Sequence, residues 1–144
     1  MADQASSSIT INAAPEAIMA VIADVESYPV WTKGISKAVV DEPGKAGPAK
    51  VTFSMSAGGF SDDYTLVYSW KDDGVSWSLA KPTKLQRSQT GSYQLSPSGD
   101  ATKVTYLLTM DSTLPMIGLM KRKAEKMIID SALKELKKRV ESLG

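Results

Sequence analysis

The stretch that decides the fold is residues 114–143, LPMIGLMKRKAEKMIIDSALKELKKRVESL, which has the pattern of one long helix. Ser112 or Thr113 can cap its first N–H groups, and Pro115 suits its first turn. At about 100° per residue, two apolar stripes run along the helix. The first consists of Met120, Ala124, Met127 and Ile128, and the second of Ile129, Leu133, Leu136, Val140 and Leu143. An apolar face that rotates in this way predicts a helix lying across a curved sheet, with the half from Leu133 anchoring the sheet.

The same helix carries a net positive charge, whereas the rest of the chain is net negative. From Ile117 to the end there are eight Lys and Arg against four Asp and Glu, whereas the rest of the chain has nine against twelve. A basic cluster, formed by Lys121, Arg122, Lys123 and Lys126, follows the apolar run 114–120. This combination is typical of a helix that touches an anionic membrane surface transiently. The alternative is that the cluster is a solvated face.

Before this helix the periodicity is mostly that of strands. A strand is expected at 6–12, a helix opened by Pro15 and continued by Ile18, Val21, Ile22 and Val25, and a second short helix or turn at 24–31. Six strands then follow between Gly, Pro and Asp turns, at 35–40, 50–56, 62–71, 75–79, 84–95 and 103–110. The predicted fold is one α+β domain over residues 1–144, with residues 1–5 flexible. Its six- to seven-stranded curved antiparallel sheet surrounds the long C-terminal helix.

Composition excludes several kinds of chemistry. The chain of 144 residues has no His and no Cys, which removes the imidazole base, the Cys nucleophile and the ordinary zinc site. The acidic loop residues lack the spacing of a calcium loop, so no metal and no cofactor are expected. A net charge of +1 does not favour nucleic acid as a partner. The N-terminus lacks the pattern of a signal peptide, which predicts a cytoplasmic protein, free or peripheral to a membrane.

The segment VIADVESYPVW at residues 21–31, which follows the helix opened by Pro15 and Glu16, resembles the START-like (helix-grip, SRPBCC) superfamily. The order of elements over nearly the whole chain is similar too, and the nearest resemblance is to its polyketide cyclase/dehydrase and coenzyme Q-binding branch. Members of this superfamily enclose an apolar cavity between sheet and long helix, where they bind lipids, quinones, sterols, hormones or polyketides. The resemblance therefore implies an internal cavity that binds a hydrophobic small molecule. We expect the half of the long helix before Asp130 to border this cavity.

Strand alternation and the helix pattern suggest which residues line such a cavity. They are Val51, Phe53, Met55, Tyr64, Leu66, Tyr68, Trp77, Leu79, Arg87, Gln89, Tyr93, Tyr106, Leu108, Met120, Met127 and Ile128. Apolar and aromatic walls with a few polar groups are what a hydrophobic ligand needs. The alternative for each apolar residue is that it only packs the core.

Arg87 is the charged residue of greatest interest. Strict alternation through Gln89, Gly91, Tyr93 and Leu95 places it on the inward face, where it would meet a polar group of a ligand. Arg87 or a tyrosine is the candidate acid if the protein is an enzyme. The alternative is a bulge in this strand that turns Arg87 to solvent.

The resemblance implies an entrance of the cavity at Tyr28 and Trp31, with Phe60 and Met116 as further entrance residues. The alternative is that Tyr28 and Trp31 fix the short helix to the core. Three functions remain open. The first is a carrier or sensor that binds a lipid, quinone or polyketide-like molecule. The second is a polyketide cyclase or dehydratase that works without His or Cys. The third is a protein-interaction module resembling ribosome-association toxins. The first is favoured because it requires only the cavity and an entrance.

Overall fold

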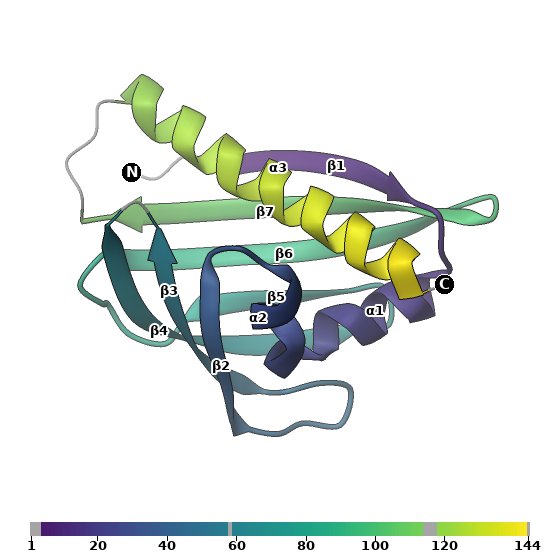
Figure 1. Ribbon diagram of the computed structural model, residues 1–144, viewed down its shortest axis with the longest axis horizontal. Coiled ribbons are helices and arrows are strands. Elements are labelled where there is room, and N and C mark those ends of the chain that lie inside the picture. Colours follow the sequence, from purple (N-terminus) through teal and green to yellow (C-terminus); the bar gives the residue numbers. More distant parts are fainter. Residues whose placement is uncertain (1–3, 58, 114–117, 144) are drawn as a thin grey trace.

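A computed structural model describes residues 4–57, 59–113 and 118–143. The order of the elements is the predicted one: a strand, two helices, six strands and a long helix (Figure 1). Their bounds are β1 (Gln4–Ile11), α1 (Pro15–Ala23), the 3-10 turn η1 (Val25–Ser27), α2 (Tyr28–Trp31), β2 (Ile35–Glu42), β3 (Lys50–Ala57), β4 (Phe60–Lys71), β5 (Gly74–Leu79), β6 (Gln86–Ser98), β7 (Ala101–Ser112) and α3 (Gly118–Leu143). The N-terminal strand starts earlier than predicted, because Gln4 already pairs with Thr109 of β7.

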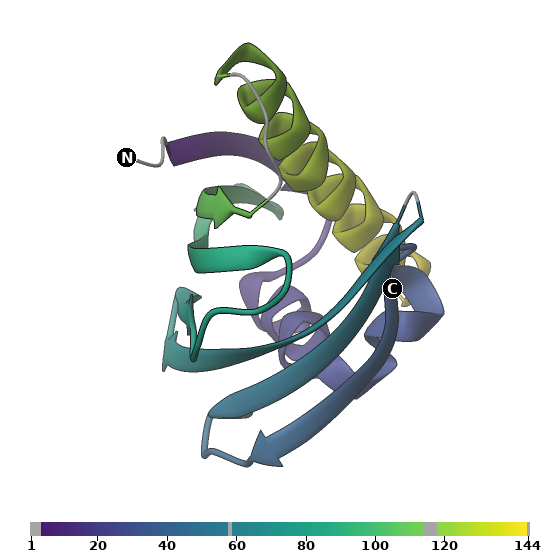
Figure 2. The ribbon, with the colours of Figure 1, turned by 90° about the vertical axis from the view of Figure 1, so that its left-hand side faces the viewer.

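The seven strands form one antiparallel sheet in the order β1-β7-β6-β5-β4-β3-β2. Strands β2 to β7 follow one another as hairpins, and β1 adds itself beside β7. The sheet is strongly curved, and Figure 2 shows that it wraps around α3 and α1 on its inner side. This arrangement confirms the predicted α+β helix-grip architecture and gives the sheet an inner, concave face and an outer, convex face.

One stripe of α3 holds the helix on the sheet. Ile129, Leu133, Leu136 and Val140 recur at helical spacing and are all at most 4% exposed. They pack mainly toward β1, β7 and α1. Figure 1 shows the helix crossing over β7 toward α1. The second predicted stripe is therefore the one buried in the core, except for Leu143, which is 60% exposed.

Polar bonds fix the C-terminal half of α3 as well. Lys137 Nζ donates to the carbonyl oxygen of Thr10 at 2.7 Å, and Glu141 Oε2 accepts the backbone N–H of Asn12 at 2.9 Å. Glu135 Oε2 accepts the backbone N–H of Lys33, after α2, also at 2.9 Å. The half of α3 after Leu133 thus anchors the sheet and α2, as predicted.

The first predicted stripe of α3 behaves differently. Met127 is 64% exposed and Ile128 43% exposed, so neither side chain is buried against the sheet. Between the two stripes Glu125 is only 2% exposed, and its carboxylate lies 4.0 Å from Lys121 Nζ. The side chain of Met120 lies outside the part of the chain whose side chains are described. The prediction that Met127 lines the interior is wrong, because the helix turns its Ile129 stripe inward and carries Met127 to the outside.

The helix α1 closes one end of the concave face. Pro15 occupies its first turn, as predicted, and Ile18, Val21 and Ile22 are buried. The hydroxyl of Thr102 on β7 donates to the carbonyl oxygen of Ala13 at 2.8 Å, which fixes the start of this helix on the sheet. No helix in the described residues is long and apolar enough to cross a membrane.

Candidate functional site

The concave face of the sheet is lined by aromatic side chains from neighbouring strands. Tyr68 on β4 lies opposite Trp77 on β5, which in turn lies opposite Gly91 on β6. Tyr93 on β6 lies opposite Tyr106 on β7. Residues in register share a face of the sheet, so the rings meet. The ring centroids of Trp77 and Tyr93 are 5.4 Å apart, and those of Tyr93 and Tyr106 are 4.8 Å apart.

A second aromatic group links β3 and β4 to α2. Phe53 lies opposite Tyr64, with ring centroids 5.6 Å apart, and Tyr28 stacks on Phe53 at 5.8 Å. The hydroxyl of Tyr28 donates to the carbonyl oxygen of Ile22 at the end of α1. Trp31 packs edge-on against Tyr28 at 5.0 Å. These contacts fix α2 to the core, which is the alternative that the sequence left open for Tyr28 and Trp31; their role at an entrance stays a prediction.

The aromatic face is only partly covered. Phe53, Trp77 and Tyr106 are buried, and Leu108 beside them is 2% exposed. Tyr64, Tyr68 and Tyr93 lie on the same face but keep part of their surface accessible to solvent. The buried residues form the floor of the concave face, and the tyrosines stand above it where a bound molecule could touch them.

The tyrosine hydroxyls differ in their hydrogen bonding. Tyr28 donates to Ile22, as described above. Among the described residues, the hydroxyls of Tyr64, Tyr68, Tyr93 and Tyr106 have no hydrogen-bond partner. A buried tyrosine commonly finds a partner within the protein. Four hydroxyls on one face are therefore left available to something else.

The same tyrosines stay protonated over the physiological range. Burial, which penalises the charged phenolate, raises the pKa of Tyr64, Tyr68, Tyr93 and Tyr106 well above the usual value. The carboxylate of Asp62 adds to the shift of the Tyr64 pKa. Each hydroxyl is consequently a hydrogen-bond donor for a ligand oxygen, and a poor source or acceptor of protons.

A polar chain, which we call the Asp62 network, occupies one end of the concave face. The network consists of Asp62, Thr83, Gln86, Gln89 and Trp77. Asp62 is 8% exposed and accepts a hydrogen bond from the Thr83 hydroxyl at 2.5 Å. That hydroxyl accepts the backbone N–H of Gln86 at 3.2 Å. The side chain of Gln86 accepts from Gln89 Nε2 at 2.6 Å, and Gln89 Oε1 accepts from Trp77 Nε1 at 3.0 Å. The aromatic face is thus bordered by fixed polar groups.

Arg87 lies outside this face, and its predicted inward orientation is wrong. Gln86 pairs with Ser112 and Ser88 pairs with Asp111, so Arg87 is the extra residue of a β-bulge. Its side chain is 62% exposed. It donates to the carbonyl oxygen of Ser112 at 3.0 Å and lies 3.4 Å from the Asp111 carboxylate. The bulge turns Arg87 to the outside and Gln86, at 5% exposed, to the inside.

The remaining predicted residues are distributed as follows. Val51 and Leu66 are buried in the core, while Met55 and Leu79 are partly exposed on the inward side of β3 and β5. Phe60 is 50% exposed at the start of β4. Met116 lies outside the described residues. The geometry brings the predicted strand residues together on one face, apart from Arg87, and leaves Met127 and Ile128 at the surface of α3.

Sequence reasoning missed Asp62, Thr83 and Gln86. A signal existed for Asp62, which precedes Tyr64 by two residues and so shares its face of β4. Gln86 had no such signal, because its orientation depends on the bulge at Arg87.

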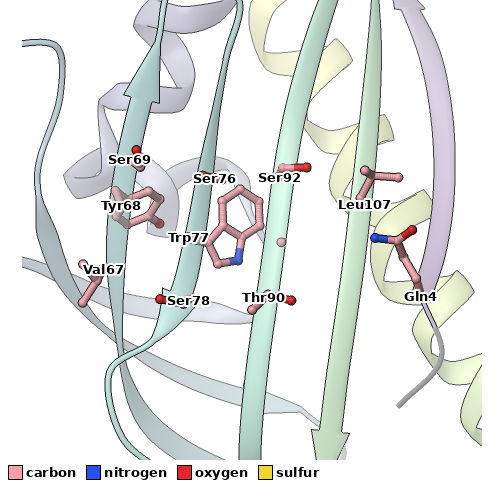
Figure 3. A pocket seen from close by; sticks show the side chains of 11 residues that line it. Gln4, Val67, Tyr68, Ser69, Ser76, Trp77, Ser78, Thr90, Ser92 and Leu107 are labelled. Atoms are coloured by element: carbon pink, nitrogen blue, oxygen red, sulfur yellow. The ribbon is translucent and has the colours of Figure 1, made fainter. Parts of the chain in front are cut away.

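The convex face carries an open depression of a different character (Figure 3). Its volume is about 430 Å³, and hydroxyl side chains dominate its lining. They are Ser69, Ser76, Ser78, Thr90 and Ser92, which alternate along their strands with the aromatic residues of the inner face. The rest of the lining consists of Gln4, Val67, Tyr68, Trp77, Gly91 and Leu107, so the depression mixes small hydroxyls with apolar groups.

A curved antiparallel sheet around a long C-terminal helix, with a partly open aromatic inner face, defines a START-like domain. The model of the polyketide cyclase / dehydrase and lipid transport family matches residues 3–141, and the chain belongs to this family. No curated protein matches the sequence.

Several solved structures share the fold. A START superfamily protein from Mycobacterium smegmatis is 22% identical, with a TM-score of 0.89 over 98% of this chain and 99% of that one. A protein from Thermus thermophilus is 21% identical, with a TM-score of 0.83 over 99% of both chains. The Zhui aromatase/cyclase from a Streptomyces species is 11% identical, with a TM-score of 0.81 over 98% of this chain and 94% of that one. At these identities the similarity establishes the fold alone.

Proposed function

We propose that the concave face binds a hydrophobic small molecule, such as a lipid, a quinone or a polyketide-like compound, and that the protein is its carrier or sensor. The observation that carries the proposal is the set of four tyrosine hydroxyls on the aromatic inner face that have no protein partner among the described residues. An apolar surface with a few well-placed polar groups suits a ligand that is mostly hydrocarbon or aromatic and carries several oxygens.

Binding is favoured over catalysis by the state of the polar groups. The raised pKa values keep the phenols protonated, so they can hold a carbonyl oxygen but exchange protons poorly near neutral pH. Arg87, the acid considered from the sequence, points away from the face. The alternative is a cyclase or dehydratase that guides a poly-keto chain by the shape of the aromatic surface. The family description and the solved aromatase/cyclase keep that alternative open.

The proposal is tested first by ligand recovery. Protein purified without detergent is analysed by native mass spectrometry and by organic extraction, and a stoichiometric hydrophobic compound is expected. Added quinones and polyaromatic ketones should also raise the melting temperature, because a ligand that binds only the folded state stabilises it. Protein that arrives empty and shows no shift with any of these compounds would refute the proposal.

Two tyrosine variants then place the ligand. Tyr93→Phe removes a hydroxyl that has no partner among the described residues, and should weaken binding of a ketone or quinone about three- to tenfold with little loss of stability. Tyr28→Phe is the matched control, because its hydroxyl is used by Ile22. It should lower the stability of the protein and leave the affinity unchanged. Equal effects of the two variants on affinity would contradict a ligand on the inner face.

Contact with an anionic membrane is a second proposal, which concerns where the ligand is exchanged. It is favoured by the exposed Met127 beside the basic cluster on α3. The cluster is partly engaged within the protein, since Lys126 Nζ bonds Ser7 at 3.1 Å and Asp130 at 3.2 Å, and Lys121 lies near Glu125. Lys123, which is exposed, is the residue to change. Lys123→Glu should weaken sedimentation with phosphatidylserine vesicles at low salt. Absence of wild-type sedimentation at low salt would end this proposal.

A further inference from the structure

Trp77 determines which atoms donate and which accept in the Asp62 network. The indole nitrogen of Trp77 can only donate, so the atom of Gln89 that it meets at 3.0 Å must be the amide oxygen. The amide nitrogen of Gln89 then points to Gln86 and donates to its oxygen at 2.6 Å. The oxygen of Gln86 is thereby occupied. Its own amide nitrogen is left as a donor.

The other end of the network offers a hydrogen-bond acceptor, the carboxylate of Asp62. One carboxylate oxygen of Asp62 accepts from Thr83. Within the described residues, the second oxygen of Asp62 and the side-chain nitrogen of Gln86 have no hydrogen-bond partner. Both residues are more than nine-tenths buried, at 8% and 5% exposed. Neither atom belongs to the fully enclosed unpaired atoms of the described residues, so a bound molecule can reach both of them.

Both residues belong to the aromatic face. Asp62 is two residues from Tyr64 on β4, and the Asp62 carboxylate is close enough to raise the pKa of Tyr64. Gln86 is joined through Gln89 to Trp77, which is in the floor of the face. A ligand on the aromatic floor would therefore reach an acceptor and a donor at one end.

We propose that Asp62 and Gln86 form a subsite for a neutral hydroxyl group of the ligand, such as an alcohol, a phenol or an enol. The inference rests on the proposed function and names the polar group that the ligand carries. A hydroxyl is both donor and acceptor, so it can donate to the Asp62 carboxylate and accept from the Gln86 amide nitrogen. A carboxylate or phosphate at the same place would be repelled by Asp62 and has no proton to donate. The subsite therefore selects hydroxylated ligands against acids of the same size.

The test compares three probes of one shape at pH 7 by isothermal titration calorimetry: 2-naphthol, naphthalene and 2-naphthoate. Wild-type protein should bind 2-naphthol about tenfold more tightly than naphthalene, as a hydrogen bond to a charged group provides, and more tightly still than 2-naphthoate. This comparison needs no variant and so does not depend on the folding of one. Binding of 2-naphthol should also shift the indole N–H resonance of Trp77, because this N–H is the last donor of the Asp62 network. The variant Trp77→Phe assigns the resonance.

Asp62→Asn then tests the residue, with Asp63→Asn as the matched control. Both changes remove one negative charge from neighbouring positions of β4, but Asp63 is exposed and lies on the outer side. Asp62→Asn should abolish the tenfold preference for 2-naphthol and improve binding of 2-naphthoate, while Asp63→Asn leaves both unchanged. Equal affinity of wild-type protein for 2-naphthol and naphthalene, or equal preferences in the two variants, would overturn the subsite. Such results leave the proposed function standing, provided that naphthalene binds. The proposed function itself fails if no ligand is recovered and if naphthalene, quinones and polyaromatic ketones all fail to bind.

Discussion

Replacement of Gly91 by alanine tests the packing of the aromatic face directly. The site of a Cβ at Gly91 lies 2.5 Å from Cε2 and Cζ2 of Trp77 and 2.7 Å from its Nε1. Carbon atoms in contact rest about 3.5 Å apart, so the indole would have to retreat by about 1 Å. Tyr68, Tyr93 and Tyr106 lie around the ring with centroids within 6.0 Å, and Trp77 is only 8% exposed. The substitution must therefore strain the face.

The magnitude follows from two costs. Overpacking of a filled core costs about 1–3 kcal/mol. Displacement of the indole by about 1 Å would also lengthen the 3.0 Å hydrogen bond from Trp77 to Gln89 beyond a useful distance, which costs about 1 kcal/mol more. The sum of about 2–4 kcal/mol corresponds to a melting temperature lower by roughly 6–12 °C for a chain of this length.

Thermal unfolding followed by circular dichroism measures this effect, with Gly34→Ala as the control. A Cβ at Gly34 meets no atom within 4 Å and the residue does not have a positive φ, so that variant should unfold within about 0.5 kcal/mol of wild type. The indole N–H resonance of Trp77 should move in Gly91→Ala alone. A melting temperature of Gly91→Ala within about 2 °C of the control would refute the close contact between Gly91 and Trp77.

Two further predictions concern titration and Arg87. Because burial raises the pKa of all five tyrosines, the folded protein holds its phenolic protons where the unfolded chain, with pKa values near 10, releases them. The tyrosines thus do not affect stability below about pH 9, and stability should fall as the pH rises above about 10. Tyrosinate absorbance at about 295 nm should appear together with unfolding, and a tyrosine that titrates near pH 10 in folded protein would contradict this. Arg87→Ala should lower the free energy of unfolding in denaturant by less than about 1 kcal/mol, since Arg87 is an exposed partner of Asp111. The same variant should leave the affinity for 2-naphthol unchanged. A large loss of affinity would show that Arg87 belongs to the site.

The aromatic face could be predicted from sequence because a pleated strand leaves little choice. In β4 the residues Tyr64, Leu66 and Tyr68 alternate with polar ones, and only one face of the sheet can be covered by α3 and α1. The predicted inward orientation of these residues is confirmed by their register with β3 and β5. Their role in binding stays a prediction.

The orientation of α3 was harder to predict. Its sequence offers two apolar stripes, and helical periodicity alone does not say which one the sheet takes up. The decision comes from partners far away in the sequence, such as the backbone atoms of Thr10 and Asn12, which bond Lys137 and Glu141. Once these contacts fix the helix, Ile129 points inward and Met127 outward. Such long-range constraints are absent from any local pattern.

The polar end of the site depends on a shift of one residue in the pairing of β6 with β7. Without a bulge, the alternation that places Gln89 and Tyr93 inward would also place Arg87 inward and Gln86 outward. The extra residue at Arg87 exchanges the two, so an uncharged amide faces the aromatic floor and the guanidinium bonds the end of β7. An inward arginine would have neutralised Asp62 and favoured an anionic ligand, whereas the observed amide leaves the carboxylate as the dominant charge at that end. The bulge, which composition cannot reveal, therefore determines the kind of polar group that this end of the face accepts.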